Sequence, residues 1–270
     1  MIGVFDSGVG GLSVLRVFLE HLPRYSFVYV GDNERAPFGD LSFDEIYKNT
    51  CEGLDFLFAK GCKIVIIACN SISAKALRRV QQEFLPKHYP NKRVLGIIIP
   101  TVESVKKLSV EKNIGMIATS ATIKSRVYIK EFKKNKVKNN FFCRATPGLV
   151  PLIENKVLDI EQIEKYLNKE LGKLMSKKIK VLILGCTHYF LILDLIKSRI
   201  DKNIEIINIP LIVAHSLKKY LKKHELFEKK LNKKSKLLLY TSLDDLKKAQ
   251  VIFEKHLNIA NCPQVRRMRN

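Results

Sequence analysis

Features that would indicate a membrane or secreted protein are missing from this chain of 270 residues. No stretch reaches the roughly 18 consecutive apolar residues that a membrane-spanning helix needs. Residues 1–6 carry no basic side chain and reach an acid at once, whereas a secretory signal begins with a basic region. We therefore expect a cytoplasmic protein with no membrane association.

The cysteines lack the spacings of two common cysteine functions. No C-x-x-C pair occurs, so neither a dithiol redox site nor a zinc site is indicated. We expect no metal, and reduced thiols throughout, as is usual in the cytosol. The six cysteines are Cys51, Cys62, Cys69, Cys143, Cys186 and Cys262.

Acidic residues are scarce beside basic ones, with 26 Asp and Glu against 48 Lys and Arg and a net charge of +22. Much of this charge lies in residues 124–138 and 218–236, mainly as lysines among Leu, Ile and Asn. No helix-turn-helix, RNA-recognition or zinc-finger pattern accompanies them. The pattern favours solvated faces of amphipathic helices over a nucleic-acid-binding surface, and the positive field could also concentrate an anionic substrate.

Apolar runs alternate with segments of helical periodicity along the whole chain. This order predicts an α/β fold with parallel sheets covered on both faces. The expected strands are residues 2–5, 27–30, 64–68, 93–99, 113–118, 141–145, 179–184, 204–209 and 236–241. The expected helices are residues 12–22, 42–60, 73–84, 101–108, 123–133, 162–176, 190–199, 212–223 and 242–257.

A weak internal repeat suggests two related halves. Residues 2–7 can be aligned with residues 114–119. In this alignment the segment around Cys69 falls near the segment around Cys186. We predict two pseudo-symmetric parallel-sheet α/β lobes with the active site in the cleft between them. The first lobe would comprise residues 1–98 with 209–270, and the second residues 99–208.

The segments at residues 64–71 and 181–188 each read as a buried strand that ends in a cysteine followed by small polar residues. Ligands of open α/β sheets bind at the carboxyl ends of strands. A helix that starts there would lower the pKa of Cys69 and of Cys186, and His188 could exchange a proton with the latter. A single such thiol is more often a small buried hydrophobe. Two at matched positions indicate a reaction that needs a sulfur on each side of the substrate.

Inversion at an acidic carbon is the chemistry that fits two opposed thiols, because one base removes a proton and an acid returns one to the other face. A Cys–His hydrolase would need one thiol and an oxyanion hole. Residues 6–11 form a glycine-rich turn that lacks both the P-loop lysine and the Rossmann spacing. No pyridoxal lysine motif is evident, so we expect no cofactor.

Five motifs in this order resemble the glutamate racemases of the aspartate/glutamate racemase superfamily, over roughly residues 1–215. They are Asp6-Ser7-Gly8-Val9-Gly10-Gly11, Gly31-Asp32 with Ala36-Pro37-Phe38-Gly39, Ala68-Cys69-Asn70-Ser71, Ala118-Thr119 with Thr122, and Gly185-Cys186-Thr187-His188-Tyr189. The chain departs from the family's usual residues at Phe38, Ser71 and Phe190, and at Asn33-Glu34, where small residues are common.

The resemblance implies cofactor-independent racemisation of L-glutamate to D-glutamate for peptidoglycan biosynthesis, by a homodimer. It implies that Cys69 deprotonates the D enantiomer with help from Asp6. It further implies that Cys186 deprotonates the L enantiomer with help from His188, which Glu154 supports.

The resemblance also assigns substrate contacts, and other functions remain open beside it. The implied substrate-binding residues are Asp6, Ser7, Pro37, Phe38, Gly39, Asn70, Ser71, Thr119, Thr122, Thr187 and His188. The alternatives are aspartate racemisation, a related isomerisation within the superfamily, and a basic nucleic-acid-binding or gyrase-binding role.

Overall fold

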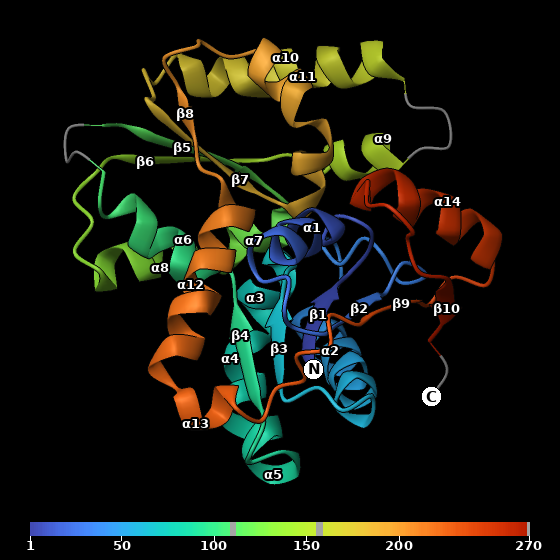
Figure 1. The fold of residues 1–270 in the computed structure, drawn as a ribbon. Helices are drawn as coiled ribbons and strands as arrows, with labels where there is room; N and C mark the ends of the chain where they lie inside the picture. The colour runs from blue at the N-terminus through green and yellow to red at the C-terminus, as the bar shows by residue number, and fades with distance from the viewer. Residues whose placement is uncertain (109–111, 155–158, 269–270) are drawn as a thin grey trace.

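Two parallel β-sheets with interleaved helices make up the protein (Figure 1). The computed structural model describes residues 1–108, 112–154 and 159–268. The larger sheet has the strand order β10-β9-β2-β1-β3-β4, and the smaller sheet has the order β6-β5-β7-β8. This arrangement confirms the α/β fold expected from the alternating pattern.

The strands form where the sequence has short apolar runs. In the larger sheet they are β1 (Ile2–Asp6), β2 (Phe27–Gly31), β3 (Ile64–Ile67), β4 (Arg93–Gly96), β9 (Leu237–Thr241) and β10 (Val265–Arg267). In the smaller sheet they are β5 (Ile114–Ala118), β6 (Phe141–Ala145), β7 (Val181–Gly185) and β8 (Glu205–Ile206). The strands β1, β2, β3, β5 and β7 are buried along their whole length, as expected of parallel strands with both faces covered.

Helices connect the strands and cover the faces of both sheets (Figure 1). They are α1 (Leu12–His21), α2 (Phe43–Ala59), α3 (Asn70–Lys75), α4 (Leu77–Arg79), the π-helical turn η1 (Val80–Phe84), α5 (Leu85–His88), α6 (Ile98–Val105), α7 (Ser120–Ser125), α8 (Val127–Lys134), α9 (Leu149–Glu154), α10 (Ile160–Met175), the 3-10 helix η2 (Thr187–Ile192), α11 (Leu193–Ser198), α12 (Ile209–Lys223), α13 (Glu225–Glu228) and α14 (Leu246–Leu257). Ser42 and Glu45 form a reciprocal capping box at the start of α2.

Several segments differ from the expectation. The strand expected at 204–209 is only Glu205–Ile206, the helix expected at 190–199 is η2 followed by α11, and β10 was not expected. The helix expected at 73–84 begins earlier and includes a π turn, which the apolar spacing does not reveal. The basic helix expected at 123–133 is two helices, because Arg126 adopts a left-handed backbone with φ of 55°. The strand expected at 93–99 ends at Gly96, and α6 includes Pro100 in its first turn, where no intrahelical N–H bond is lost.

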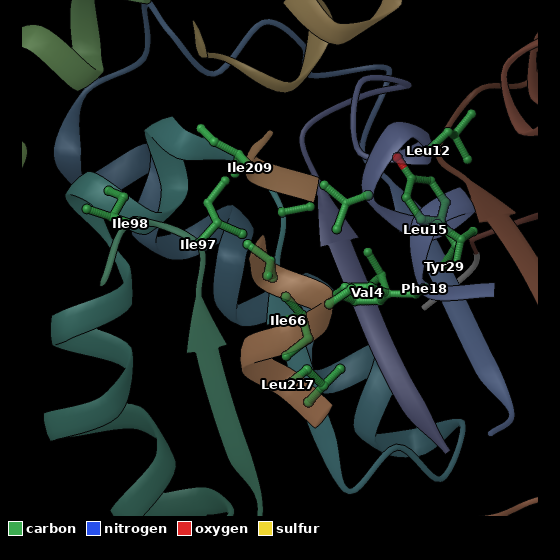
Figure 2. Packing of buried hydrophobic residues seen from close by; sticks show 14 of the residues in the cluster. Val4, Leu12, Leu15, Phe18, Tyr29, Ile66, Ile97, Ile98, Ile209 and Leu217 are labelled. Carbon is green, nitrogen blue, oxygen red and sulfur yellow. The ribbon is translucent and has the colours of Figure 1, made fainter. Parts of the chain in front are cut away.

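One apolar core joins the helices α1 and α12 to the larger sheet. Leu15 and Phe18 of α1 and Leu217 of α12 pack with Val4 of β1 and Ile66 of β3 (Figure 2). Each side chain is almost wholly buried, and such burial stabilises the fold by about 1.5–3 kcal/mol per residue. The core thus fixes the strands whose carboxyl ends carry the polar residues described below.

The C-terminal part of the chain extends the larger sheet. Strand β9 pairs with β2 and β10 pairs with β9, while α14 packs against α1. The lobe boundaries at residues 98/99 and 208/209 stay a prediction. Within the described ranges, no helix is both long and apolar enough to cross a bilayer.

Candidate active site

The carboxyl ends of the two sheets meet, and the polar motifs gather there. Asp6 ends β1, and Cys69 lies two residues after β3, the strand beside it. In the smaller sheet, Thr119 follows β5 and Cys186 follows β7. The hydroxyl of Thr187 donates to Asp6 Oδ1 over 3.3 Å, so the ends of the two sheets are in direct contact.

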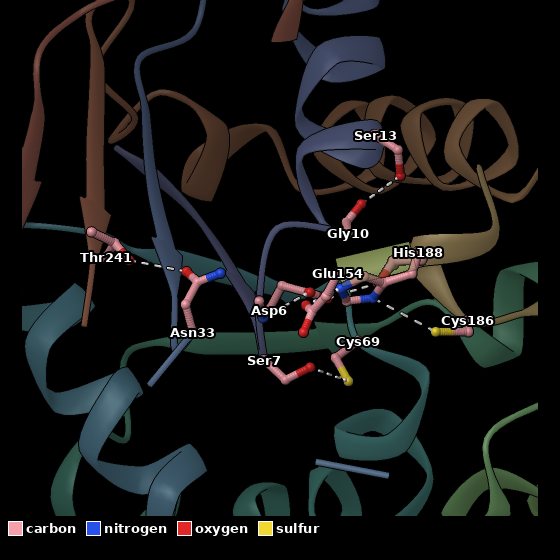
Figure 3. Close-up of polar contacts among 12 residues, drawn as sticks. Asp6, Ser7, Gly10, Ser13, Asn33, Cys69, Glu154, Cys186, His188 and Thr241 are labelled. Atoms are coloured by element: carbon pink, nitrogen blue, oxygen red, sulfur yellow. Dashed lines mark hydrogen bonds and ion pairs between the residues drawn. The ribbon is translucent and has the colours of Figure 1, made fainter. Parts of the chain in front are cut away.

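Cys69 lies at the start of α3 and is 6% exposed. Its Sγ lies 3.4 Å from the Ser7 hydroxyl (Figure 3). Burial, and then the charge of Asp6, raises the pKa of Cys69 to about 12. The expected lowering of this pKa by a helix N-terminus is therefore wrong, because the loss of hydration outweighs the helix start.

Asp6 is fully buried, and this burial raises its pKa to about 6. The charge of His188 and hydrogen bonds from the backbone of Gly8 and Gly11 oppose the rise. The Gly8 N–H donates to Asp6 Oδ2 over 3.1 Å. A carboxyl group that titrates this close to neutrality can exchange protons at physiological pH.

Cys186 has a different set of partners. Its Sγ lies 3.8 Å from His188 Nδ1, and His188 Nε2 lies 2.7 Å from Glu154 Oε1 (Figure 3). Burial lowers the pKa of His188, but hydrogen bonds with Cys186 and Glu154 outweigh it and hold that pKa well above its ordinary value. The imidazole is thus held in its cationic form beside the thiol.

Hydroxyl and amide groups from both sheets line the same region. Ser71 Oγ lies 2.9 Å from Thr119 Oγ1, which in turn lies 3.1 Å from Thr122 Oγ1. Asn70 Oδ1 accepts a bond of 2.8 Å from the hydroxyl of Tyr128. Within the described part of the chain, Asn70 Nδ2 is a buried donor with no partner. Such a donor is suited to a carboxylate ligand.

The loop before α2 contributes the remaining residues singled out from the sequence. The carbonyl of Gly39 accepts a bond of 3.2 Å from the N–H of Ala121, which ties this loop to α7. Phe38 is buried in the apolar cluster that includes Cys69. Pro37 is half-buried and follows a cis peptide bond from Ala36.

The glycine turn allows close approach to η2. A Cβ added at Gly10 would lie 2.5 Å from Thr187 Oγ1 and 2.7 Å from the backbone nitrogen of His188. Any side chain at this position would push the turn away from His188.

Four buried tyrosine and threonine side chains support the site, and the sequence predicted no site role for them, although Tyr189 lies in one of the five motifs. They are Tyr29, Tyr128, Thr146 and Tyr189. Tyr29 donates to the carbonyl of Gly8 over 2.6 Å, and the hydroxyls of Thr146 and Tyr189 lie 2.6 Å apart. Their apolar sequence surroundings are typical of core residues, and a hydroxyl partner distant in sequence leaves no local signal.

The described residues contain no group of three or more His, Cys, Asp or Glu side chains placed to hold a metal ion. All six cysteines are free.

The model of the Asp/Glu/hydantoin racemase family matches residues 13–216, which is most of the chain. The protein belongs to this family. The matched region includes both Cys69 and Cys186, whereas Asp6 and the strands β9 and β10 lie outside it.

Known family members resemble this chain over most of its length. It is 35% identical to the glutamate racemase of Roseobacter denitrificans over 236 residues, which cover 83% of this chain and 86% of that one. Glutamate racemase isoform RacE1 of Bacillus anthracis superposes with a TM-score of 0.86 at 29% identity, covering 99% and 96% of the two chains. Glutamate racemase of Francisella tularensis, solved in complex with D-glutamate, has a TM-score of 0.83 at 30% identity, covering 98% and 95%.

Proposed function

We propose that the protein is a glutamate racemase that interconverts L- and D-glutamate, with Cys69 and Cys186 as the two opposed acid/base groups. The identity to curated glutamate racemases and the likeness to one solved with D-glutamate support the reaction. The observation that carries the proposal is the pair of thiols at the carboxyl ends of β3 and β7, one bonded to Ser7 and under the charge of Asp6, the other beside His188.

In the L-to-D direction, the thiolate of Cys186 takes the Cα proton and becomes a thiol. The thiol of Cys69 gives its proton to the opposite face of the carbanion and becomes a thiolate. The positive imidazole of His188 lies 3.8 Å from Cys186 Sγ, on the side from which it can donate a hydrogen bond to the sulfur. The raised pKa of Cys69 keeps it protonated, so the resting protein is prepared for L-glutamate.

In the reverse direction Cys69 must first lose its proton. Asp6 is the acceptor that we propose, because it is the buried carboxyl group whose charge acts on Cys69. Its own pKa near 6 means that it passes the proton on to solvent around neutrality and does not keep it. The cationic imidazole of His188 gives a proton to the thiolate of Cys186, so the two thiols have exchanged roles. Cys69 then takes the Cα proton of D-glutamate, and Cys186 returns a proton to the carbanion.

The carbanion needs stabilisation, because a Cα proton is far less acidic than a thiol. We propose that the substrate carboxylates accept hydrogen bonds from Asn70 Nδ2 and from the hydroxyls of Ser71, Thr119 and Thr122. The hydroxyl of Thr187 would join them by exchanging its bond to Asp6 for one to the substrate. Donors that are already held in place lose little free energy by reorganisation when the charge develops. The unpartnered amide of Asn70, held by Tyr128 on its other atom, supports this assignment.

We also propose that the product serves peptidoglycan biosynthesis in the cytoplasm and that the protein is a homodimer. These proposals rest on the family resemblance alone. Light scattering on the purified protein tests the dimer, and a mass of about 31 kDa for the particle would exclude it.

The decisive experiment follows the circular dichroism of L-glutamate and L-aspartate with the protein and three variants. We expect C69A and C186A each to abolish racemisation of glutamate while both retain the native far-ultraviolet spectrum. C262A is the control, because Cys262 is a free, partly exposed thiol of the C-terminal part and should not matter. Near-normal turnover in C69A or C186A would exclude the two-thiol mechanism, and turnover of aspartate alone would exclude glutamate as substrate.

A further inference from the structure

A tyrosine of the larger sheet connects the C-terminal part of the chain to the Asp6 turn. Tyr29 lies on β2 with none of its surface exposed, and its hydroxyl donates to the carbonyl of Gly8 over 2.6 Å. The Phe253 ring of α14 packs edge-on against the Tyr29 ring, with centroids 5.6 Å apart and an interplanar angle of 82°. Phe253 is itself fully buried, so the Tyr29 ring has little freedom to move.

The same peptide group is held at its other end. In the amide orientation that satisfies both of its atoms, Asn33 Oδ1 accepts from the Val9 N–H over 3.3 Å. Its Nδ2 then donates to Thr241 Oγ1 and to the carbonyl of Gly31, each over 3.0 Å. Figure 3 shows Asn33 reaching to Thr241, which ends β9. The Gly8–Val9 peptide is thus bonded on both its C=O and its N–H side.

Neighbouring backbone approaches this peptide and its tyrosine partner closely. A Cβ added at Gly31 would lie 2.7 Å from the Gly8 carbonyl oxygen, and one at Gly11 would lie 3.0 Å from the Tyr29 hydroxyl. Since a buried carbonyl without a partner is costly, the Tyr29 hydroxyl also satisfies the backbone of a buried residue.

The clamped peptide directly follows the two residues that act on Cys69. The Ser7 hydroxyl lies 3.4 Å from Cys69 Sγ, and the Gly8 N–H donates to Asp6 Oδ2. Cys186, in contrast, is bonded to His188, which Glu154 holds, and no hydrogen bond joins the Gly8–Val9 peptide to either of these side chains among the described residues. The turn nevertheless packs against them, since a Cβ added at Gly8 would lie 3.3 Å from Glu154 Oε1. A displacement of the Gly8–Val9 peptide therefore moves the hydrogen-bonded neighbours of Cys69, whereas the hydrogen bond of Cys186 to His188 does not pass through this peptide.

We propose that Tyr29 and Asn33 are positioning residues for proton transfer at Cys69, and that β9 and α14 hold them through Thr241 and Phe253. The segment at residues 237–257 would thus take part in catalysis although it lies beyond the region matched by the family model. The proposal rests on the proposed function, in particular on Cys69 as the base toward D-glutamate.

The two proton transfers can be separated by isotope effects. The equilibrium constant between enantiomers is one, so kcat/KM must fall equally in both directions and cannot tell the two sides apart. With deuterium at Cα, Cys69 would remove the label from D-glutamate and Cys186 would remove it from L-glutamate. A higher barrier at Cys69 therefore increases the isotope effect on kcat/KM for D-glutamate and decreases that for L-glutamate.

The test compares wild-type protein with Y29F and N33A. We expect kcat/KM to fall about 10- to 100-fold in Y29F, since a small displacement of an acid/base group has effects of this size. Asn33 is partly exposed, so N33A should fold even if Y29F does not. Y240F is the matched control, because Tyr240 is a buried tyrosine of β9 whose ring packs on Phe56.

The proposal predicts opposite changes of the two isotope effects in Y29F or N33A and none in Y240F. A purely structural role would reduce the amount of active protein and leave both isotope effects at their wild-type values, which would overturn the proposal. Equal changes in both directions would overturn it as well. Failure of the wild-type protein to racemise glutamate would instead overturn the proposed function, so the two failures are distinguishable.

Discussion

Removing the charge of Glu154 should show how far the cationic form of His188 contributes to catalysis. Glu154 Oε1 lies 2.7 Å from His188 Nε2, and its side chain is 30% exposed. In E154Q the distance can be kept while the negative charge is lost. A hydrogen bond to a charged partner contributes about 1.5–3 kcal/mol, which corresponds to a fall of about one to two in the pKa of His188.

The sign of the pH effect follows from the same geometry. The pKa of His188 is raised, so in the wild-type protein the imidazole stays cationic well above its ordinary pKa. In E154Q it should lose its proton at lower pH, and the thiolate of Cys186 then loses its neighbouring cation. We expect kcat/KM to fall about 10- to 100-fold near pH 8 and the alkaline limb of the pH–rate profile to move to lower pH.

The assay is racemisation of L-glutamate across pH, with the imidazole titrated by NMR of histidine-labelled protein. E164Q is the matched control, because Glu164 pairs with Arg199 and has a side chain that is 29% exposed. The reasoning is refuted if E154Q and E164Q have the same pH–rate profile as the wild-type protein. A lowered imidazole pKa without any loss of activity would show that the charge of His188 is not needed.

Three further predictions use other parts of the site. The folded state favours protonated Asp6, so this favourable contribution is complete below about pH 4 and is lost as the pH rises through 6. D6N should therefore increase the free energy of unfolding by about 2–3 kcal/mol at pH 7.5 and change it little at pH 4. If D6N shifts the urea midpoint of unfolding equally at both pH values, this prediction is contradicted. G10A should lose about 100-fold in kcat/KM, because its Cβ would collide with η2. G172A is the control, because an added Cβ there meets nothing within 4 Å. It should keep full activity and unfold at an equal or higher urea concentration. Y128F should raise KM for glutamate about tenfold with a smaller effect on kcat, because the amide of Asn70 loses the 2.8 Å bond that orients it, and an unchanged KM would exclude this role.

The fold class could be predicted from the sequence, because the strands are short apolar runs and the helices have clear periodicity. The segments ending at Cys69 and Cys186 could be placed at strand ends since buried parallel strands leave a strong local pattern. Helix interruptions could not be predicted. The π turn at Val80–Phe84 and the left-handed Arg126 depend on packing between distant elements, which no local spacing records.

Only part of the site could be predicted from the sequence. Cys186 and His188 are two residues apart, so their contact could be anticipated from spacing. The pKa of Cys69 could not be anticipated, because burial and the nearby Asp6 charge arise from tertiary packing and outweigh the helix start. Tyr29 escaped notice for the same reason, since its partner at Gly8 is 21 residues away in the chain.

The unequal surroundings of the two thiols have a consequence for successive turnovers. After L-glutamate is converted, the proton sits on Cys186 and is missing from Cys69, which is the form that accepts D-glutamate. Both thiols are only 6% exposed, so water has little access to return the protein to its first form. At high substrate concentration this return becomes a separate step of the cycle. The protonation state of the two thiols then still reflects which enantiomer the protein last converted. Tracer experiments would detect this persistence. When unlabelled D-glutamate is converted in excess, labelled L-glutamate that starts at equilibrium with its enantiomer would drift transiently away from equilibrium.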